Sequence, residues 1–375
     1  MNSQKPRVLI FGVAAVQADA LKFLKQMGCE TYACARAADG PGAEVADHFE
    51  PIDFTDEAAV TRWIETENID IIYSVGSDLA MPVAMKLSAK LGKRHFVSAD
   101  TAYACNNKDL LRDRLAHMTV GNIRSQSLAM PGDFKADEIT FPVIVKPADS
   151  QGQRGIFIAE SEAEVYRYFA KAREFSRSGI VIVEEFIEGP EYSVNGYVVD
   201  GEPVFVLASD RETWPQFTGL IHRHLVPTRI LSDAEQESIR SVIVEACHLL
   251  NIENGPVYAQ MKVRDGRPYI IEVTPRLDGC HMWKLINSAT GFNLLKLAFE
   301  QLLYDDTSEL AKLDDLTVEK RTLTFFCREP HTIMNREELI VPDDALDHDY
   351  YYKTGETIRP VNRLYEKIGY YITAE

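Results

Sequence analysis

The chain has 375 residues, of which 46% are hydrophobic, and a formal net charge of −17. This length exceeds one ordinary core, so we expect two or more lobes, on a prior of ~100 to 200 residues per domain. The negative charge argues against unassisted binding to nucleic acid or to anionic membranes. Because no apolar run approaches the ~18 residues of a membrane-spanning helix, we expect a cytoplasmic protein without a membrane partner.

The first ~95 residues alternate between strand-like and helix-like runs, as in a parallel α/β sheet. Thr55 stands at the start of an acidic turn and is expected to cap a helix there. The alternation predicts a Rossmann-like lobe. Its expected strands are residues 7–12, 31–35, 48–52, 70–75 and 95–98, and two of its expected helices are residues 18–27 and 79–91.

A dinucleotide-binding function fits this lobe poorly. The first strand ends in Phe11-Gly12-Val13-Ala14, with one glycine where the NAD fingerprint has three. Side chains in place of the missing glycines would keep the backbone away from a pyrophosphate. An NAD-dependent dehydrogenase therefore stays an alternative that rests on the first lobe alone.

Further along, the pattern changes to hairpins around two helices. Ser161 and Glu164 have the spacing of a capping box. The turns Asp200-Gly201 and Asp265-Gly266 separate strand-like runs. A small β-rich lobe is expected at the end of the chain. The expected strands are residues 141–147, 156–159, 180–185, 322–327 and 370–373, and the expected helices are residues 161–176 and 233–250.

The six cysteines are scattered, without a Cys-x-x-Cys pair. This spacing is not that of a zinc site, so we expect reduced and mostly buried thiols. They are Cys29, Cys34, Cys105, Cys247, Cys280 and Cys327.

A lysine at the end of an apolar strand, Lys146, stands directly before the glycine-bearing loop 149–155. Such a loop can fold over a polyphosphate, because its N–H groups and the ammonium all point at oxygens. The loop lacks the Walker pattern, and an ordinary hairpin gives the same local sequence. Phosphate binding and a structural turn are both open on this evidence.

A second feature is the hinge at residues 184–191, where an apolar strand ends, turns at Gly189-Pro190 and resumes. Exposed backbone groups beside apolar side chains suit the edge and faces of an adenine, and Glu191 can accept from ribose hydroxyls. A plain loop would look similar.

Near the end of another strand, Glu272, Thr274 and Arg276 follow at steps of two, which places them on one face of a strand. A carboxylate that can hold a divalent cation, beside a guanidinium that can grip an anion, suits phosphate chemistry. A surface ion pair is the alternative.

Five features of the chain resemble, in order and spacing, the motifs of the ATP-grasp superfamily. They are Lys108, Lys146 with its loop, the hinge, Gln260 with Glu272, and Arg276. The resemblance covers the whole chain and is strongest to single-lobe relatives of the carbamoyl phosphate synthetase large subunit and to amino-acid ligases. It implies an α/β ATP-grasp fold. The implied parts are a Rossmann-like pre-ATP-grasp lobe (1–98), a small lid subdomain with its linking helix (99–187), a large subdomain with the metal strand (188–308) and a small C-terminal β-rich lobe (309–375).

The resemblance also implies roles for individual residues. Arg276 would stabilise the transferred phosphoryl group, and Gln260, Glu272 and Thr274 would lie at the Mg²⁺ site. The residues that it implies for ATP are Lys108, Lys146, Gln151, Gly152, Gln153, Arg154, Gly155, Glu184, Glu185, Phe186, Ile187 and Glu191.

Two positions depart from the family pattern. Thr274 stands where the family usually has an asparagine, and Gln260 is neutral where many relatives have an acid. The site therefore carries less negative charge, and we expect one Mg²⁺ at least, with a second left open. His222, His224 and His281 lie near the expected active face and are candidate substrate contacts.

The function that the resemblance implies is an ATP- and Mg²⁺-dependent, ADP-forming ligase that joins a small carboxylate to an amine through an acyl phosphate. One alternative is activation of bicarbonate, as in carbamoyl phosphate synthetases and carboxylases. A nucleotide-binding regulatory protein without turnover is another. No nucleic-acid partner is expected, and assembly as a homodimer is left open.

Overall fold

The computed structural model describes residues 5–150, 154–361 and 364–375. Its first part is a parallel four-stranded sheet in the order β3-β2-β1-β4. The central strand β1 is fully buried from Val8 to Phe11, which explains its unbroken apolar run. The elements of this lobe are β1 (Arg7–Phe11), α1 (Ala15–Gln26), β2 (Glu30–Cys34), α2 (Pro41–Val45), β3 (His48–Glu50), α3 (Glu57–Thr66), β4 (Ile71–Tyr73) and α4 (Ala80–Lys90).

The expected strand at residues 95–98 is wrong. Phe96 and Val97 are buried, but as irregular chain: the Phe96 ring packs edge-on against Tyr73 and Tyr197. Side-chain packing on β4 and on β9 (Glu191–Val199) of another sheet, rather than backbone pairing with β4, explains this apolar run. The cap of α3 is also not Thr55, because the Asp56 carboxylate accepts from the Ala59 N–H at 3.0 Å.

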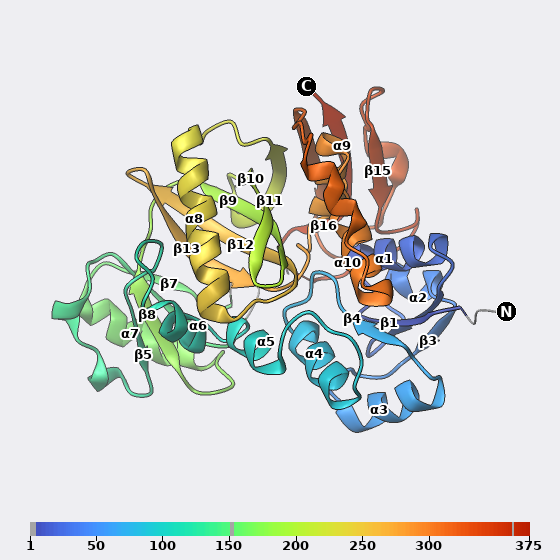
Figure 1. Cartoon of the computed structure of the whole chain (residues 1–375). Coiled ribbons are helices and arrows are strands. Elements are labelled where there is room, and N and C mark those ends of the chain that lie inside the picture. Colours follow the sequence, from blue (N-terminus) through green and yellow to red (C-terminus); the bar gives the residue numbers. More distant parts are fainter. Residues whose placement is uncertain (1–4, 151–153, 362–363) are drawn as a thin grey trace.

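A second, antiparallel sheet in the order β5-β8-β6-β7 forms a small lobe with its own core. Figure 1 shows this lobe at one side of the molecule, away from the N-terminal lobe. Ser161 starts α7 without a side-chain cap bond, and Glu164 accepts from the Glu160 N–H instead, so the expected capping box is wrong. The elements, with two linking helices, are α5 (Ala99–Cys105), α6 (Lys108–Leu115), β5 (Ser125–Leu128), β6 (Val143–Pro147), β7 (Phe157–Ala159), α7 (Glu162–Arg173) and β8 (Val181–Glu185).

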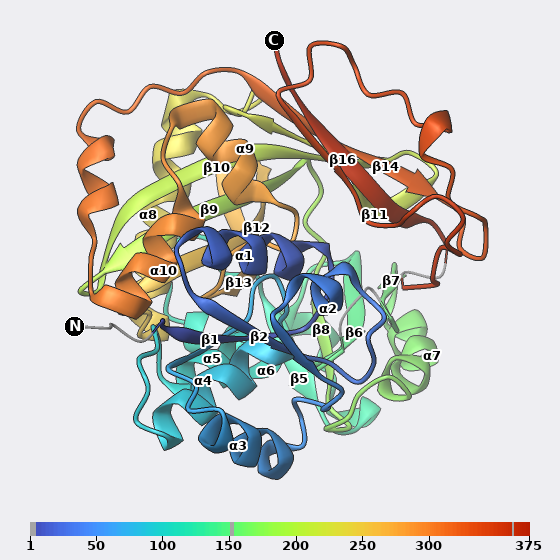
Figure 2. The same cartoon turned by 90° about the vertical axis from the view of Figure 1, so that its right-hand side faces the viewer.

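The third sheet has eight strands in the order β13-β12-β9-β10-β11-β14-β16-β15. It takes in the C-terminal strands, so the expected β-rich end of the chain extends the same sheet past residue 308. Figure 2 shows β14 and β16 beside β11. The elements are β9 (Glu191–Val199), β10 (Glu202–Trp214), β11 (Phe217–Val226), α8 (Asp233–Leu250), β12 (Gly255–Arg264), β13 (Arg267–Thr274), α9 (Met282–Thr290), α10 (Leu294–Tyr304), β14 (Arg321–Arg328), β15 (Asp347–Tyr350) and β16 (Glu366–Ala374).

One hydrophobic core joins the N-terminal lobe to this long sheet, whereas the small lobe packs around a separate core. Two separately packed bodies can change their relative position with little loss of buried apolar area. The six cysteines are free and buried, as expected. Among the described residues, no helix has the length and apolar character to cross a membrane.

Candidate active site

A band of polar side chains crosses one face of the long sheet. Cross-strand partners of an antiparallel sheet point to the same face. Gln260 of β12 lies opposite Glu272 of β13, and Arg211 of β10 lies opposite both Glu191 of β9 and His224 of β11. The Gln260 amide donates to Glu191 at 2.9 Å, which connects the two halves of the band. The predicted metal ligands therefore share a face with side chains from three further strands.

Glu272 and Gln260 are the pair that can hold a cation. Burial, together with the nearby Asp78 carboxylate, raises the pKa of Glu272, although Lys108 and Arg276 oppose that shift. A carboxylate that is costly to keep charged gains from a bound cation. Within the described residues no group of three or more His, Cys, Asp or Glu side chains could hold a metal, so phosphate oxygens and water would have to complete the shell.

Arg276 lies beyond the end of β13 and is buried. Its Nε lies 2.6 Å from Oδ1 of Asp78, in the N-terminal lobe, and its Nη1 donates to the Leu277 carbonyl at 3.0 Å. A close approach of two loops makes this pairing, because a Cβ on Gly76 would lie 2.6 Å from the Gly279 Cα. Thr274, two residues before Arg276, is buried opposite Tyr258.

A buried ion triad connects the small lobe to the metal strand. The Glu184 carboxylate accepts from Lys146 Nζ and, at 3.0 Å, from Arg112 Nε. Arg112 also donates to the carbonyls of Ile270 and Ile271, both at 3.0 Å. The side chains of this triad are at most 5% exposed. Arg112 was not among the sequence candidates, because it lies on α6, whose pattern carries no sign of a partner 72 residues away.

The triad has two opposite effects on proton binding. Burial alone would raise the pKa of Glu184, but Arg112 and Lys146 outweigh burial and lower that pKa to about 2. Burial also lowers the pKa of Lys146 to about 8, assisted by Arg112 and Lys108 and opposed by Glu184. Lys146 therefore loses its charge at a mildly alkaline pH.

This shift predicts a pH dependence of nucleotide binding. Protonated Lys146 attracts phosphate oxygens and neutral Lys146 does not, so the affinity for MgATP should fall by up to about tenfold per pH unit above about pH 8. Calorimetric titration between about pH 7 and about pH 9.5 would measure the fall. Lys146→Arg, whose guanidinium stays charged, is the control and should show a flat profile. A flat profile for the unaltered protein would contradict the assignment.

Hydrogen bonds hold the first residues of the loop after β6 in place. The Asp149 carboxylate accepts the N–H groups of Arg177 and Ser178 at 2.9 and 2.8 Å. Lys108 donates from Nζ to the Ser150 carbonyl at 3.0 Å, so it lies at the start of the predicted phosphate lid. Gly155 has φ 74° and packs on Phe175, where a side chain would collide. The predicted lid residues Gln151, Gly152 and Gln153 lie outside the described residues, and Arg154 and Gly155 follow them.

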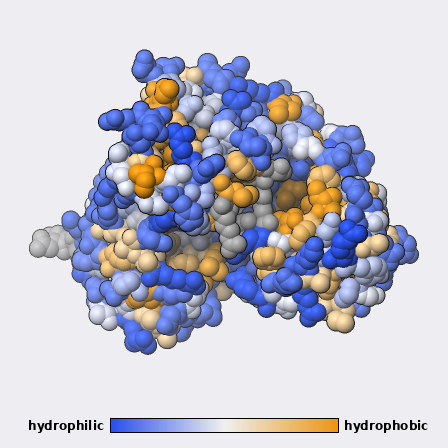
Figure 3. Space-filling view, turned by 180° about the vertical axis from the view of Figure 1, so that it is seen from behind, coloured by the Kyte–Doolittle hydropathy of each residue, from blue (hydrophilic) through white to orange (hydrophobic). Residues whose placement is uncertain are grey.

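The hinge offers backbone rather than side-chain groups. The Glu185 N–H donates to the Arg124 carbonyl and the Phe186 N–H to the Pro142 carbonyl, both at 3.0 Å. For the buried Ile187 the N–H has no acceptor among the described residues. Viewed from behind, the surface is hollowed near its middle, with apolar residues in the wall (Figure 3). An unpaired amide beside apolar side chains is suited to an adenine edge.

Glu184 and Glu191, in contrast, are already paired. Glu184 belongs to the buried triad, and Glu191 accepts from Arg211 and Gln260. A nucleotide could contact these carboxylates only by sharing or replacing those bonds. Direct contact of either side chain with adenine or ribose stays a prediction.

The three candidate histidines differ in their surroundings. Both ring nitrogens of His281 are used, by Asp19 of α1 at 2.7 Å and by Tyr351 at 2.8 Å, which ties three parts of the chain together. His222 packs on Trp214, with ring centroids 4.0 Å apart. His224 is fully buried within the polar band. Of the three, His281 has no ring nitrogen left for a substrate.

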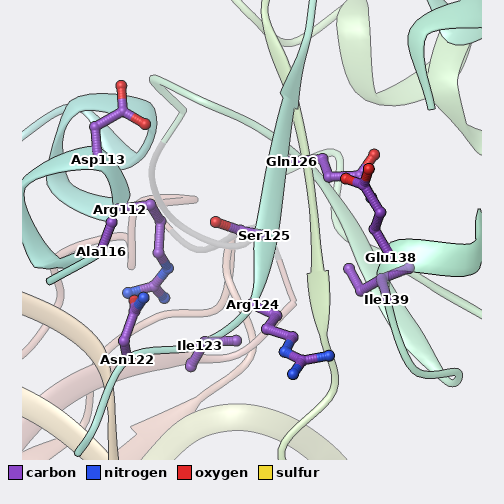
Figure 4. A pocket seen from close by; sticks show the side chains of 10 residues that line it. All are labelled: Arg112, Asp113, Ala116, Asn122, Ile123, Arg124, Ser125, Gln126, Glu138 and Ile139. Atoms are coloured by element: carbon purple, nitrogen blue, oxygen red, sulfur yellow. The ribbon is translucent and has the colours of Figure 1, made fainter. Parts of the chain in front are cut away.

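A cavity of about 250 Å³ lies between α6 and β5, and Arg112 of the buried triad is one of its lining residues. Figure 4 shows Arg112 and Asn122 with their polar ends close together in its wall. None of the residues predicted for ATP or metal lines the cavity. It is therefore not the space in which the polar band and the hinge would hold a nucleotide.

Comparisons with known proteins bear on the domain type and on the fold. Residues 139–283 match the model of the ATP-grasp domain. Dapdiamide A synthase of Enterobacter agglomerans is 25% identical over 301 residues, which cover 75% of this chain and 69% of that protein. The N-terminal section of the carbamoyl phosphate synthase large chain of Methanopyrus kandleri is 25% identical over 266 residues, 67% of this chain and 46% of that protein. The chain thus spans about half the length of this second relative.

Solved structures extend the likeness to the whole fold. The L-amino acid ligase of Bacillus licheniformis superposes with a TM-score of 0.81 at 18% identity, covering 100% of this chain and 94% of that chain. The biotin carboxylase domain of Hydrogenobacter thermophilus 2-oxoglutarate carboxylase, solved with MgADP and bicarbonate, has a TM-score of 0.81 at 15% identity, with 100% and 87% covered. The fold and the ligase class expected from the motifs are confirmed. Residues 139–283 are thus an ATP-grasp domain by their match to the family model, and the whole chain has the fold of these solved structures.

Proposed function

We propose that this protein is an ADP-forming ligase that uses MgATP to join a small carboxylate to an amine. The observation that carries the proposal is the convergence of Glu272 and Gln260, Arg276 and the Lys146 triad at one end of the long sheet. Dapdiamide A synthase and the L-amino acid ligase, to which the chain is similar, support an amine as the acceptor.

The residues have distinct roles in this proposal. Lys108 and Lys146 bind phosphate oxygens, and the Ile187 N–H binds the adenine edge. Glu272 and Gln260 would hold Mg²⁺, which would neutralise charge on the phosphate oxygens. Arg276 releases its hydrogen bond to Asp78 and binds the transferred phosphoryl group instead, where it stabilises the charge that develops on that group.

Two bond exchanges complete the reaction. A carboxylate oxygen of the substrate attacks the γ-phosphorus, which forms an acyl phosphate and releases ADP. The amine nitrogen then attacks the acyl carbon, loses a proton and releases phosphate. The side chains of the site contribute position and charge rather than covalent chemistry, so the loss of one of them should cost orders of magnitude in rate.

Substrate-stimulated phosphate release from MgATP, screened over pairs of small carboxylates and amines, tests the proposal. We expect release only when both partners are present, together with a coupled product in the mass spectrum. Release with bicarbonate alone would instead favour the carbamoyl phosphate type of reaction, to which the similarity with carbamoyl phosphate synthase points. Tight MgATP binding without release for any pair would indicate a regulatory protein. A cytoplasmic location and a homodimer stay predictions.

A further inference from the structure

A cluster of basic side chains lies at the far end of the polar band, away from the metal strand. Arg211 of β10 and His224 of β11 are cross-strand partners. Lys367 of β16 reaches the same place, because its Nζ lies 4.0 Å from the centre of the Phe325 ring, which His224 also contacts edge-on. Arg211, His224 and Lys367 form what we call the basic cluster.

The basic cluster lacks the acceptors that buried donors require. Neither ring nitrogen of the fully buried His224 has a hydrogen-bond partner among the described residues. Arg211 gives one Nη1 bond to Glu191, but its buried Nε has no described acceptor. In the described chain Lys367 has no carboxylate within ion-pair distance, and its Nζ donates only to the Cys280 sulfur, at 3.2 Å. Unpaired buried donors are rare in native structures and indicate a missing partner.

The charges around the cluster favour an anion as that partner. Besides Glu191, Asp278 acts electrostatically on Arg211 and Lys367, and its Oδ1 accepts the Cys280 N–H at 2.8 Å. Burial raises the pKa of Asp278, and Arg276, Lys367 and Arg211 oppose that shift. Glu191 is shared between Arg211 and, at 3.9 Å, Lys262. The cations therefore exceed the carboxylates that neutralise them.

The cluster is also adjacent to the predicted point of phosphoryl transfer. Asp278 and Cys280 follow Arg276 by two and four residues in the same loop. The Arg276 guanidinium lies 5.4 Å from the centre of the Tyr258 ring, and Tyr258 belongs to the same face of the sheet as Glu272. A ligand held at Arg276 by one end can therefore extend toward the basic cluster.

We propose that the basic cluster of Arg211, His224 and Lys367 binds a second acidic group, a carboxylate or a phosphate, on the carboxylate substrate. The inference rests on the proposed function and narrows its substrate class to dianions. Lys367 and the Arg211 Nε–H donate to the acidic group, and Lys367 exchanges the weak thiol acceptor of Cys280 for it. His224 adds one N–H donor as a neutral imidazole. A monocarboxylate would leave all of these donors unpaired.

Binding and turnover with matched acids test the proposal. Malonate, succinate and glutarate, with their 2-amino derivatives and 3-phosphonopropionate, are compared with monocarboxylates of the same carbon number. In the presence of MgATP we expect the best dianion to bind at least about tenfold more tightly than its matched monoanion, as one charge-assisted hydrogen bond would give. Tighter binding of 3-phosphonopropionate or of a dicarboxylate then identifies which acidic group the basic cluster binds.

Lys367→Met should remove this preference and leave the affinity for MgATP unchanged, whereas Lys320→Met, at an exposed position, should retain it. Lys367→Gln serves where the methionine variant does not fold. Equal binding of all matched pairs, or a preference that survives both Lys367 variants, would overturn the inference. Selective dianion binding without phosphate release for any amine would overturn the ligase function but leave the basic cluster as an anion site. Phosphate release that is equally fast with monoanions would support the ligase function but overturn the basic cluster as an anion site.

Discussion

Glu272→Ala is expected to abolish turnover while the protein stays folded. The carboxylate lies opposite Gln260 at the predicted Mg²⁺ site, and its removal takes away the one acid among the three predicted metal ligands. We expect kcat for phosphate release to fall by about 10²-fold to 10³-fold, as when a group that stabilises developing charge is lost. Phosphate release under saturating MgATP and substrates is the measurement.

The same substitution should not destabilise the fold, because the pKa of Glu272 is raised in the folded state. Burial raises the pKa of Glu272, so the folded state holds the charged form less well than the unfolded chain does. At neutral pH the carboxylate therefore opposes folding, and alanine should leave the melting temperature unchanged or higher. Glu237→Ala on the exposed side of α8 is the matched control and should keep both activity and stability. Normal turnover by Glu272→Ala would remove the metal assignment.

Arg112→Ala is expected to have the largest effect on stability. The substitution leaves the Glu184 carboxylate buried with Lys146 as its remaining ionic partner, and it leaves two carbonyls of β13 without their donors. Breaking a buried ion pair by removing one partner costs about 3 to 5 kcal/mol. Urea unfolding of the variant and the unaltered protein would measure the loss.

The matched control lies two residues away on the same helix. Arg114 pairs with Asp100, but Asp100 is 79% exposed, so Arg114→Ala should cost less than about 1 kcal/mol. Equal losses for the two variants would mean that the triad contributes no more than a surface pair. Arg112→Ala should also weaken MgATP binding. Without Arg112, Lys146 is the remaining ionic partner of Glu184 and is therefore less available to phosphate oxygens.

Local pattern was a good guide to several elements, although the helix caps expected at Thr55 and Ser161 did not form. The helix at residues 233–250 was predicted with the bounds that α8 has, and in the structure Ser232 and Glu235 form a capping box at its start. The turns at Asp200-Gly201 and Asp265-Gly266 have the positive φ angles that their residues favour. The pattern misled at residues 95–98, where an apolar run is buried by packing on β4 and β9 instead of by pairing as a strand. Apolarity reports burial but does not say what provides it.

The sequence by itself was enough to predict an ATP-grasp ligase, because a lysine before a glycine loop, a polar hinge, and an acid and an arginine along one strand are local spacings that one chain segment can carry. Thr274 and Gln260, its departures from the family, are visible in the same way. Only the tertiary structure decided that Asp78 pairs with Arg276, that Arg112 fixes Glu184, and that a basic cluster ends the polar band. These partners are far apart in the chain, so no period or spacing connects them until the lobes pack together.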